Sequence, residues 1–417
     1  MLFDCIVVGG GAGGLLAAGR MAKAGVSVLL LEKNPGLGKK LSITGKGRCN
    51  VTNACERDVL LSNVVRNPRF LMSAFSRFSP EDTQALFTSL SVPLKVERGN
   101  RVFPVSDHAP DIVRALERFI SKGGVCVKHE AVMSISKDAE GDFAVSTTEG
   151  LYSSKALLLA TGGVSYPLTG STGDGYRFAE HFGHTLIPPR ASLVPLETRE
   201  DFCRKTMGLS LRNVTFSLYE REGGKRLFSD FGELLFTHFG LSGPLVLSAS
   251  AAIVCDSPEG MVAKIDLKPA LDEKTLDARI CRDFVENSNK NLVNALDLLL
   301  PRKIIAPLIS LSGLDPHKKV HSISKEERQT LLSFIKGLPL TIKAFRPVEE
   351  AIVTRGGLSV SEFSPKTMES KIVPGLYAVG EVLDVDALTG GFNLQIAFST
   401  AACAADAVTA SMLEVSI

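Results

Sequence analysis

Glycines near the N-terminus stand at the spacing that a dinucleotide pyrophosphate requires. The run Gly9–Gly14 matches the pattern GxGxxG. Glycines at these positions permit a tight turn, a close approach of the backbone to the pyrophosphate, and close packing of helix and strand. The following helix would offer unpaired N–H groups and its positive dipole end to the phosphates. The expected contacts are Gly9, Gly11, Ala12, Gly13 and Gly14.

An acidic residue completes this motif. Glu32 lies 18 positions past Gly14, at the end of the next apolar run. A carboxylate there accepts hydrogen bonds from the adenosine ribose hydroxyls, and it would repel a 2′-phosphate. FAD and NAD are therefore favoured over NADP, and we include the neighbouring Lys33 in the cofactor-binding set.

The elements around the motif form a βαβ unit. Strands are predicted over 3–8 and 26–31, with a helix over 15–24 that ends at Gly25. The two strands are mostly apolar, which suits a parallel sheet that is covered on both faces. Residues 33–55 show little periodicity. Further helices are predicted over 68–90, 111–122 and 396–413, and further strands over 125–128, 131–136, 143–147, 155–160 and 375–379.

The chain is too long for one core, and its pattern changes twice. After Pro188-Pro189 the stretches alternate as antiparallel strands do, and from 271 the pattern is helical. We predict an α/β, Rossmann-like domain that binds FAD or NAD, with a parallel sheet, made of 1–190 and 345–417. An inserted substrate domain, 191–344, interrupts it, with a β part over about 191–270 and a helical part over about 271–344.

The net charge argues against a nucleic-acid partner. The chain has 47 basic and 45 acidic residues among 417, a formal charge of +2. Binding driven by phosphate neutralisation needs a basic excess, although a local patch could hide inside this balance. We therefore expect a small-molecule substrate and no nucleic acid. The oligomeric state is left open.

The cysteines and the apolar runs point to a cytoplasmic protein. The eight cysteines are scattered and none has CxxC spacing, which is typical of reduced thiols, and no metal site is expected. The N-terminus has Asp4 where a signal peptide would carry positive charge. The uncharged run 241–255 is too short to span a bilayer, so we expect no membrane association.

Several motifs beyond the first glycine loop carry a family resemblance. The segment 39–53 (KKLSITGKGRCNVTN) and the later runs, in the same order along the chain, resemble the aminoacetone oxidase and bile-acid reductase-like family of FAD-dependent oxidoreductases. This family belongs to the glutathione-reductase-like flavoprotein class. Lys46 stands where the family often has glycine, and Phe392 where tyrosine is common. The later runs are LATGG at 159–163, GSTGDGY at 170–176, LFTHFGLSGP at 235–244, VTRGG at 353–357, TMESK at 367–371, GEVLD at 380–384 and GGFNLQ at 390–395.

The resemblance implies FAD as the cofactor and a second set of contacts. Glu381, which follows Gly380, would bind the ribityl chain, and the helix opened by Gly390 and Gly391 would point its N-terminus at the flavin N1–C2=O edge. Val132 would read adenine through its backbone. The remaining predicted cofactor contacts are Lys40, Thr44, Gly45, Gly47, Arg48, Asn50, Ala160, Thr161, Gly162, Gly163, Asn393, Leu394 and Gln395.

The flavin would perform the hydride chemistry, so an obvious acid/base pair is not required. We favour cofactor contact for Arg48, although its guanidinium could hold an acidic substrate. Cys49 and Cys55 have the wrong spacing for a redox dithiol and are expected to be buried thiols. No second dinucleotide motif is visible, so NAD(P)H would bind transiently as electron donor, or O₂ would reoxidise the flavin.

These observations leave several functions open. The favoured one is an FAD-dependent oxidoreductase of a small organic substrate, either an NAD(P)H-dependent reductase of an activated C=C bond or an amine-type oxidase. A flavin-dependent RNA-modifying enzyme is an alternative, which the charge balance disfavours. A non-catalytic binding protein stabilised by FAD is the remaining alternative.

His238 is the candidate catalytic residue. It lies in the inserted domain, in a turn that we predict to join a strand to a helix, and its imidazole could donate a proton to the substrate. A turn histidine bonded to backbone is the competing interpretation. We expect His238→Ala to leave the FAD content, read from the absorbance spectrum, unchanged while turnover falls roughly tenfold or more. Unchanged turnover would eliminate the catalytic role.

Overall fold

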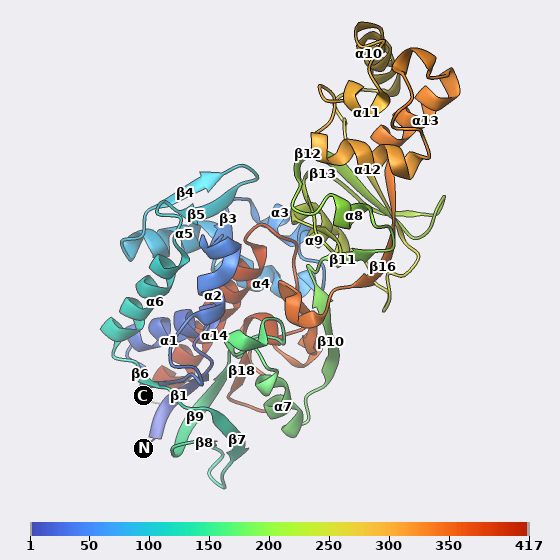
Figure 1. Ribbon diagram of the computed structural model, residues 1–417. Coiled ribbons are helices and arrows are strands. Elements are labelled where there is room, and N and C mark those ends of the chain that lie inside the picture. Colours follow the sequence, from blue (N-terminus) through green and yellow to red (C-terminus); the bar gives the residue numbers. More distant parts are fainter. Residues whose placement is uncertain (1, 415–417) are drawn as a thin grey trace. The chain divides into compact units, whose positions relative to one another are not determined.

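A computed structural model describes residues 2–414, and the chain divides into two compact units (Figure 1). The sheet unit comprises Met1–Ser192 and Val348–Ile417, and the barrel unit comprises Leu193–Pro347. The boundaries predicted from sequence, after 190 and before 345, lie within three residues of this division.

A seven-stranded sheet forms the centre of the sheet unit. Strand β9 pairs in parallel with β1 on one side and with β18. Strand β1 pairs in parallel with β2, and β2 pairs in parallel with β6. The antiparallel hairpin β7–β8 adds to the start of β9. The confirmed fold class is therefore α/β with a Rossmann-type parallel sheet. The strands are β1 Leu2–Val8, β2 Val28–Leu31, β6 Cys126–Lys128, β7 Val132–Lys137, β8 Phe143–Thr147, β9 Leu151–Leu159 and β18 Leu376–Ala378.

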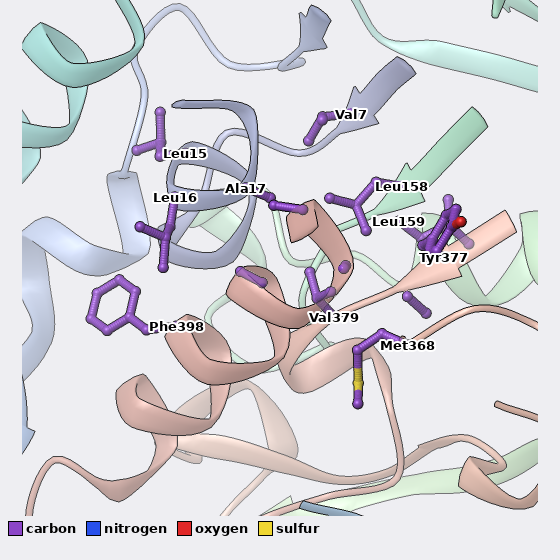
Figure 2. Packing of buried hydrophobic residues seen from close by; sticks show 14 of the residues in the cluster. Val7, Leu15, Leu16, Ala17, Leu158, Leu159, Met368, Tyr377, Val379 and Phe398 are labelled. Carbon is purple, nitrogen blue, oxygen red and sulfur yellow. The ribbon is translucent and has the colours of Figure 1, made fainter. Parts of the chain in front are cut away.

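Three helices cover this sheet: α1 (Ala12–Lys23), α6 (Ala109–Gly123) and α14 (Phe392–Glu414). Apolar strands and the apolar face of α1 meet in one buried cluster with α14, as Figure 2 shows for Leu16 and Phe398. By length and composition the stretch Phe392–Leu413 could cross a membrane. However, 56% of the 18-residue apolar part of this stretch is buried inside the protein. A core helix has the same composition, so we read it as one.

The segments around the sheet differ in detail from the sequence prediction. The aperiodic stretch 33–55 contains α2 (Lys39–Ile43), a 3₁₀ turn and β3 (Thr52–Asn53). The stretch 68–90 is helical as predicted and breaks near Phe78, because Ser79 caps a new helix through a capping box with Asp82. The smaller helices of this unit are α3 Arg57–Ser62, α4 Met72–Arg77, α5 Pro80–Ser89 and α7 Asp174–His181.

A small antiparallel sheet lies beside α14, in the order β3-β5-β4. Its other strands are β4 Leu94–Glu97 and β5 Arg101–Pro104. The fully buried amide of Gln395 in α14 fixes this region: its Oε1 accepts from the hydroxyls of Thr52 (2.6 Å) and Thr83 (2.8 Å). Its Nε2 donates to the carbonyl of Phe78 at 3.1 Å. One side chain thus joins α14 to β3 and α5.

A two-stranded antiparallel ladder of β10 (Leu186–Ser192) and β17 (Val353–Leu358) completes the sheet unit. The Pro188-Pro189 pair, expected to mark a domain boundary, lies inside β10. The register of the ladder shifts there, between Ile187 and Arg190. Proline has no N–H to donate, so an irregular edge ladder tolerates the pair where a central strand would not.

The barrel unit contains a closed barrel in the order β11-β14-β13-β12-β15-β16. Its strands alternate buried and exposed positions, as a filled small barrel requires. The strands are β11 Leu196–Thr198, β12 Ser210–Tyr219, β13 Arg226–Phe236, β14 Gly240–Ser242, β15 Val262–Asp266 and β16 Leu338–Phe345.

The helices of the barrel unit lie mostly between β15 and β16. They are α8 Phe202–Lys205, α9 Pro244–Ala251, α10 Glu273–Glu286, α11 Leu292–Ala295, α12 Arg302–Ser312 and α13 Lys325–Lys336. The prediction of a helical part over 271–344 was wrong at its end, because β16 begins at Leu338 and closes the barrel. Leu338, Leu340 and Ile342 alternate into the barrel core.

The Gln395 contacts generate a stability prediction. Gln395→Ala would leave the buried Thr52 hydroxyl without its acceptor, whereas Thr83 keeps the Ser79 carbonyl, and it would open a cavity, so we expect a loss of roughly 2–4 kcal/mol. Gln84→Ala is the matched control, since that half-exposed amide bonds only within its own helix, and we expect a change under about 1 kcal/mol. Chemical denaturation followed by circular dichroism measures both. Equal losses would contradict the structural role of Gln395.

Candidate flavin site

The predicted cofactor residues gather at the carboxyl edge of the parallel strands. Gly9 follows β1, Glu32 follows β2, Ala160 follows β9, and Gly380 lies two residues beyond the end of β18. Parallel strands deliver these loops to one edge, where α/β folds bind their ligands.

The glycine loop has the geometry that its spacing predicts. A Cβ on Gly14 would lie 1.9 Å from the carbonyl oxygen of Gly9, and a Cβ on Gly9 would lie 2.5 Å from the carbonyl oxygen of Ala160. These two glycines therefore permit close packing of helix, strand and neighbouring loop. A Cβ on Gly11 would meet nothing within 4 Å. Gly11 thus borders the open space beside the α1 N-terminus, where Ala12 and Gly13 carry first-turn N–H groups.

Glu32 is held at the end of β2 by the adjoining loops. One carboxylate oxygen accepts from the N–H of Gly10 at 2.8 Å, and the other accepts from the N–H and side chain of Asn34. Lys33 instead contacts Thr172 and forms an ion pair with Asp174 at 2.5 Å. The predicted carboxylate is therefore in position, whereas the ammonium of Lys33 ties in the 170–175 loop.

The structure joins two predicted residues that are 341 positions apart. The Lys40 ammonium lies 2.7 Å from Oε2 of Glu381, and the other carboxylate oxygen, Oε1, accepts from Ser165 Oγ (3.0 Å) and the Thr354 N–H (2.8 Å). Burial alone would raise the pKa of Glu381, but Lys40 and these hydrogen bonds together lower it. Glu381 is therefore held as the carboxylate, paired with the Lys40 ammonium. Sequence reasoning missed Ser165 and Thr354, although Thr354 lies in the VTRGG run.

Tight backbone contacts surround the predicted flavin end. A Cβ on Gly163 would lie 2.3 Å from Thr354 Oγ1, and one on Gly391 would lie 2.4 Å from the Thr52 carbonyl oxygen. Gly162, Gly380 and Gly391 all have positive φ. These approaches leave little room for side chains other than glycine.

The N-terminus of α14 differs from the prediction at one residue. The N–H of Gln395 donates to the Gly391 carbonyl, so it is the first intrahelical bond and is unavailable to a flavin. Its side chain is buried in the contacts with β3 and α5. Asn393 and Leu394 lie in the first turn, whose N–H groups have no intrahelical acceptor. The Asn393 side chain bonds both backbone groups of Ala387.

The 44–50 loop is built on left-handed backbone. Gly45, Lys46 and Gly47 have φ of 57°, 59° and 83°, and Thr44 closes the turn by accepting the N–H of Cys49. The left-handed conformation explains why the family often has glycine where this chain has Lys46.

Arg48 is engaged within the protein. Its guanidinium pairs with Glu97 at 2.5 Å and Asp107 at 2.6 Å and lies over the Phe103 ring. The geometry makes it an anchor of the 44–50 loop, and its predicted cofactor contact stays a prediction. Cys49 and Cys55 are buried, as expected, and burial raises the pKa of the Cys49 thiol to about 12.

Two orphaned polar atoms fit a bound cofactor. Asn50 Oδ1 and Thr161 Oγ1 are buried and have no hydrogen-bond partner among the described residues. Buried polar atoms without partners are rare, and a ligand is one explanation. Together with the open space beside Gly11, they show that the residues present fit FAD.

Val132 and His238 belong to other elements than these contacts. Val132 begins β7 and pairs with Thr147 of the hairpin, close in sequence to the end of β6. His238 is exposed in the barrel unit, in the turn between β13 and β14. The predicted strand-to-helix turn was therefore wrong, because β14 intervenes before α9 begins at Pro244.

The geometry agrees with the comparisons with known proteins. Residues 3–407 match the family described as the HI0933-like protein Rossmann domain. The chain belongs to the HI0933-like family. It is an FAD-dependent oxidoreductase, as the family, the relatives and the fold together indicate.

Two relatives and one more distant structure resemble the whole chain. A ribosomal RNA dihydrouridine synthase of Escherichia coli is 34% identical over 98% of this chain and 98% of its own length. A 3-dehydro-bile acid delta(4,6)-reductase of Clostridium scindens is 29% identical over 94% of this chain and 96% of its own. The structure of a 3-ketosteroid Δ1-dehydrogenase from Sterolibacterium denitrificans has a TM-score of 0.53 at 12% identity, covering 98% and 100%. That last likeness shows the fold alone.

The contrast between Gly11 and Gly14 predicts two different defects. Gly14→Ala forces a Cβ against backbone, so we expect a loss of roughly 1–3 kcal/mol of stability in the FAD-free protein. Gly11→Ala enters open space, so we expect unchanged FAD-free stability and weaker FAD binding. Thermal unfolding of FAD-free protein and a flavin fluorescence titration measure the two effects. Unchanged FAD affinity in Gly11→Ala would contradict the assignment of that space to the pyrophosphate.

Proposed function

We propose that this enzyme reduces the C5=C6 bond of uridine in ribosomal RNA to dihydrouridine, with NAD(P)H as electron donor. The observation that carries this proposal is the 34% identity to a ribosomal RNA dihydrouridine synthase over 98% of both chains. The match extends through the sheet unit and the barrel unit alike. A second protein of the same name, from Haemophilus influenzae, is 34% identical over 96% of this chain.

The names of the relatives also favour reduction over amine oxidation. Dihydrouridine formation and a delta(4,6)-reductase activity both describe the saturation of a carbon–carbon double bond. The C5=C6 bond of uracil is conjugated to the C4 carbonyl, so it accepts a hydride at C6 and a proton at C5. Reduction of an activated C=C bond is one of the two reactions that the sequence left open, there for a small organic substrate and here for a nucleobase.

The described residues would hold and polarise the reacting groups. When bound, FAD supplies the hydride transfer between donor and substrate. The glycine loop and Glu32 would hold the AMP half, and the ionised Glu381 would hold the ribityl chain at the Lys40 contact. The α14 N-terminus would stabilise negative charge on the ring. His238 is our proposed proton donor for C5.

The nucleic acid of this proposal departs from our expectation of a small-molecule substrate. That expectation rested on a net charge of +2, which describes the total and not its distribution. An enzyme can bind RNA through a local basic surface even when acidic residues elsewhere balance its charge.

The test combines the electron donor with the product. FAD-loaded enzyme is mixed anaerobically with NADH or NADPH, and flavin absorbance is followed before and after adding an unmodified rRNA transcript. We expect bleaching by one donor, recovery on RNA addition, and RNA fragments carrying two added hydrogens by mass spectrometry. FAD-free protein is the control. Bleaching by small amines together with unmodified RNA would overturn the proposal.

A further inference from the structure

Two segments of the sheet unit have a marked excess of basic over acidic residues. Segments 33–55 and 94–107 carry eight basic and two acidic side chains, a net charge of +6. The rest of the chain carries 39 basic and 43 acidic residues, a net charge of −4. Asp174 and Glu381 pair with Lys33 and Lys40 from outside these segments, which leaves a local net charge of +4 within a chain whose total is +2.

The fold brings these two segments together. Thr52 and Asn53 of β3 pair with Val102 and Arg101 of β5, and β5 pairs with β4. Figure 1 shows α2, β3, β4 and β5 grouped in one part of the sheet unit. The ion pairs of Arg48 with Glu97 and Asp107 connect the segments as well. We call the side chains of 33–55 and 94–107 the basic surface.

The acidic residues of the basic surface are already neutralised. Glu97 and Asp107 are shared between Arg48 and Lys95. In contrast, Lys39, Lys46 and Arg101 form no ion pair with any residue in the described range 2–414. Lys39 and Lys46 are exposed, and Arg101 is half-exposed. These three cations are available to an external anion.

Lys46 in particular occupies an unfavourable backbone conformation. Its φ of 59° and ψ of 41° are left-handed, which costs a residue other than glycine about 1–2 kcal/mol. A charged side chain kept at such a position, between two glycines, indicates a use for that charge. The same loop supplies the predicted cofactor contacts Gly45 and Gly47, so the charge lies next to the candidate flavin site.

Apolar side chains are exposed among these cations. Ile43 is 46% exposed, Val96 is 55% exposed and Val105 is 52% exposed. The exposed cations suit the phosphates of an RNA strand, and the exposed aliphatic side chains add apolar surface to the same segments.

We propose that the basic surface, which includes the 44–50 loop, binds the phosphates of a single-stranded segment of the substrate RNA. This proposal rests on the proposed function, because it names the surface by which the rRNA would be held. Lys39, Lys46 and Arg101 neutralise phosphates, and Arg48 acts through the loop that it anchors.

The test compares two triple variants of the FAD-loaded enzyme. Lys39→Gln, Lys46→Gly and Arg101→Gln are combined in one protein. Lys274→Gln, Lys290→Gln and Lys325→Gln, three exposed lysines of the barrel unit, form the control with the same charge change. Fluorescence anisotropy with a labelled unmodified rRNA transcript gives the dissociation constant between 50 and 200 mM salt, concentrations that span the usual salt dependence of phosphate contacts.

The result expected is a change in salt dependence. Three lost contacts to single-stranded RNA should flatten the log–log slope by about 2, so the wild type should lose roughly 15-fold more affinity than the variant across this range. FAD content and flavin reduction by NAD(P)H should stay unchanged. The control triple should keep the wild-type slope.

The outcomes separate this inference from the proposed function. A wild-type slope in the first variant, with dihydrouridine still formed by the wild type, overturns the basic surface alone. Equal loss in both variants also overturns it, because the binding would then be unspecific. Polyglutamate that competes as well as RNA would assign the surface to an acidic protein. No RNA binding and no dihydrouridine with the wild type would overturn both proposals.

Discussion

The contact between Lys40 and Glu381 is the interaction on which the candidate site depends. It joins α2 to the segment after β18, and Ser165 and Thr354 complete it from two further segments. Removing charges from water is costly, and only good geometry with additional hydrogen bonds repays it. Here four segments supply that geometry. The pair therefore defines where the two ends of the chain meet.

Much of the fold could be predicted because its signals are local. The glycine spacing, the apolar strands and the acidic Glu32 lie within one βαβ unit, and each has a direct physical meaning. The capping box at Ser79 was equally local. Gly163 and Gly391 were identified by resemblance, and their close approaches to Thr354 and Thr52 give the physical reason for them.

What could not be predicted depends on contacts between distant residues. Nothing in the sequence tells that Gln395 bonds Thr52 and Thr83, or that Arg48 pairs with Glu97 and Asp107. Both side chains serve packing and loop anchoring at positions where a cofactor contact was equally plausible from type alone. Strand β16 was missed because a helical stretch precedes it and its partners lie far back in the chain.

The contrast between local signals and contacts of distant residues applies to the charge of the chain as well. A total of +2 is an average over the chain, whereas a polyanion responds to local potential. Pairing of β3 with β5 combines two separate basic segments into one surface that includes the 44–50 loop. An enzyme that must admit a polyanionic substrate needs such a surface only where the reaction takes place.

The central claim is that uridine in rRNA oxidises the reduced enzyme, and one half-reaction tests it without any nicotinamide donor. The FAD-loaded protein is photoreduced anaerobically and mixed in a stopped-flow instrument with unmodified rRNA transcript. The account predicts that the oxidised flavin spectrum returns at a rate that saturates with RNA concentration, with one dihydrouridine formed per flavin. A flavin that stays reduced until O₂ is admitted would contradict it.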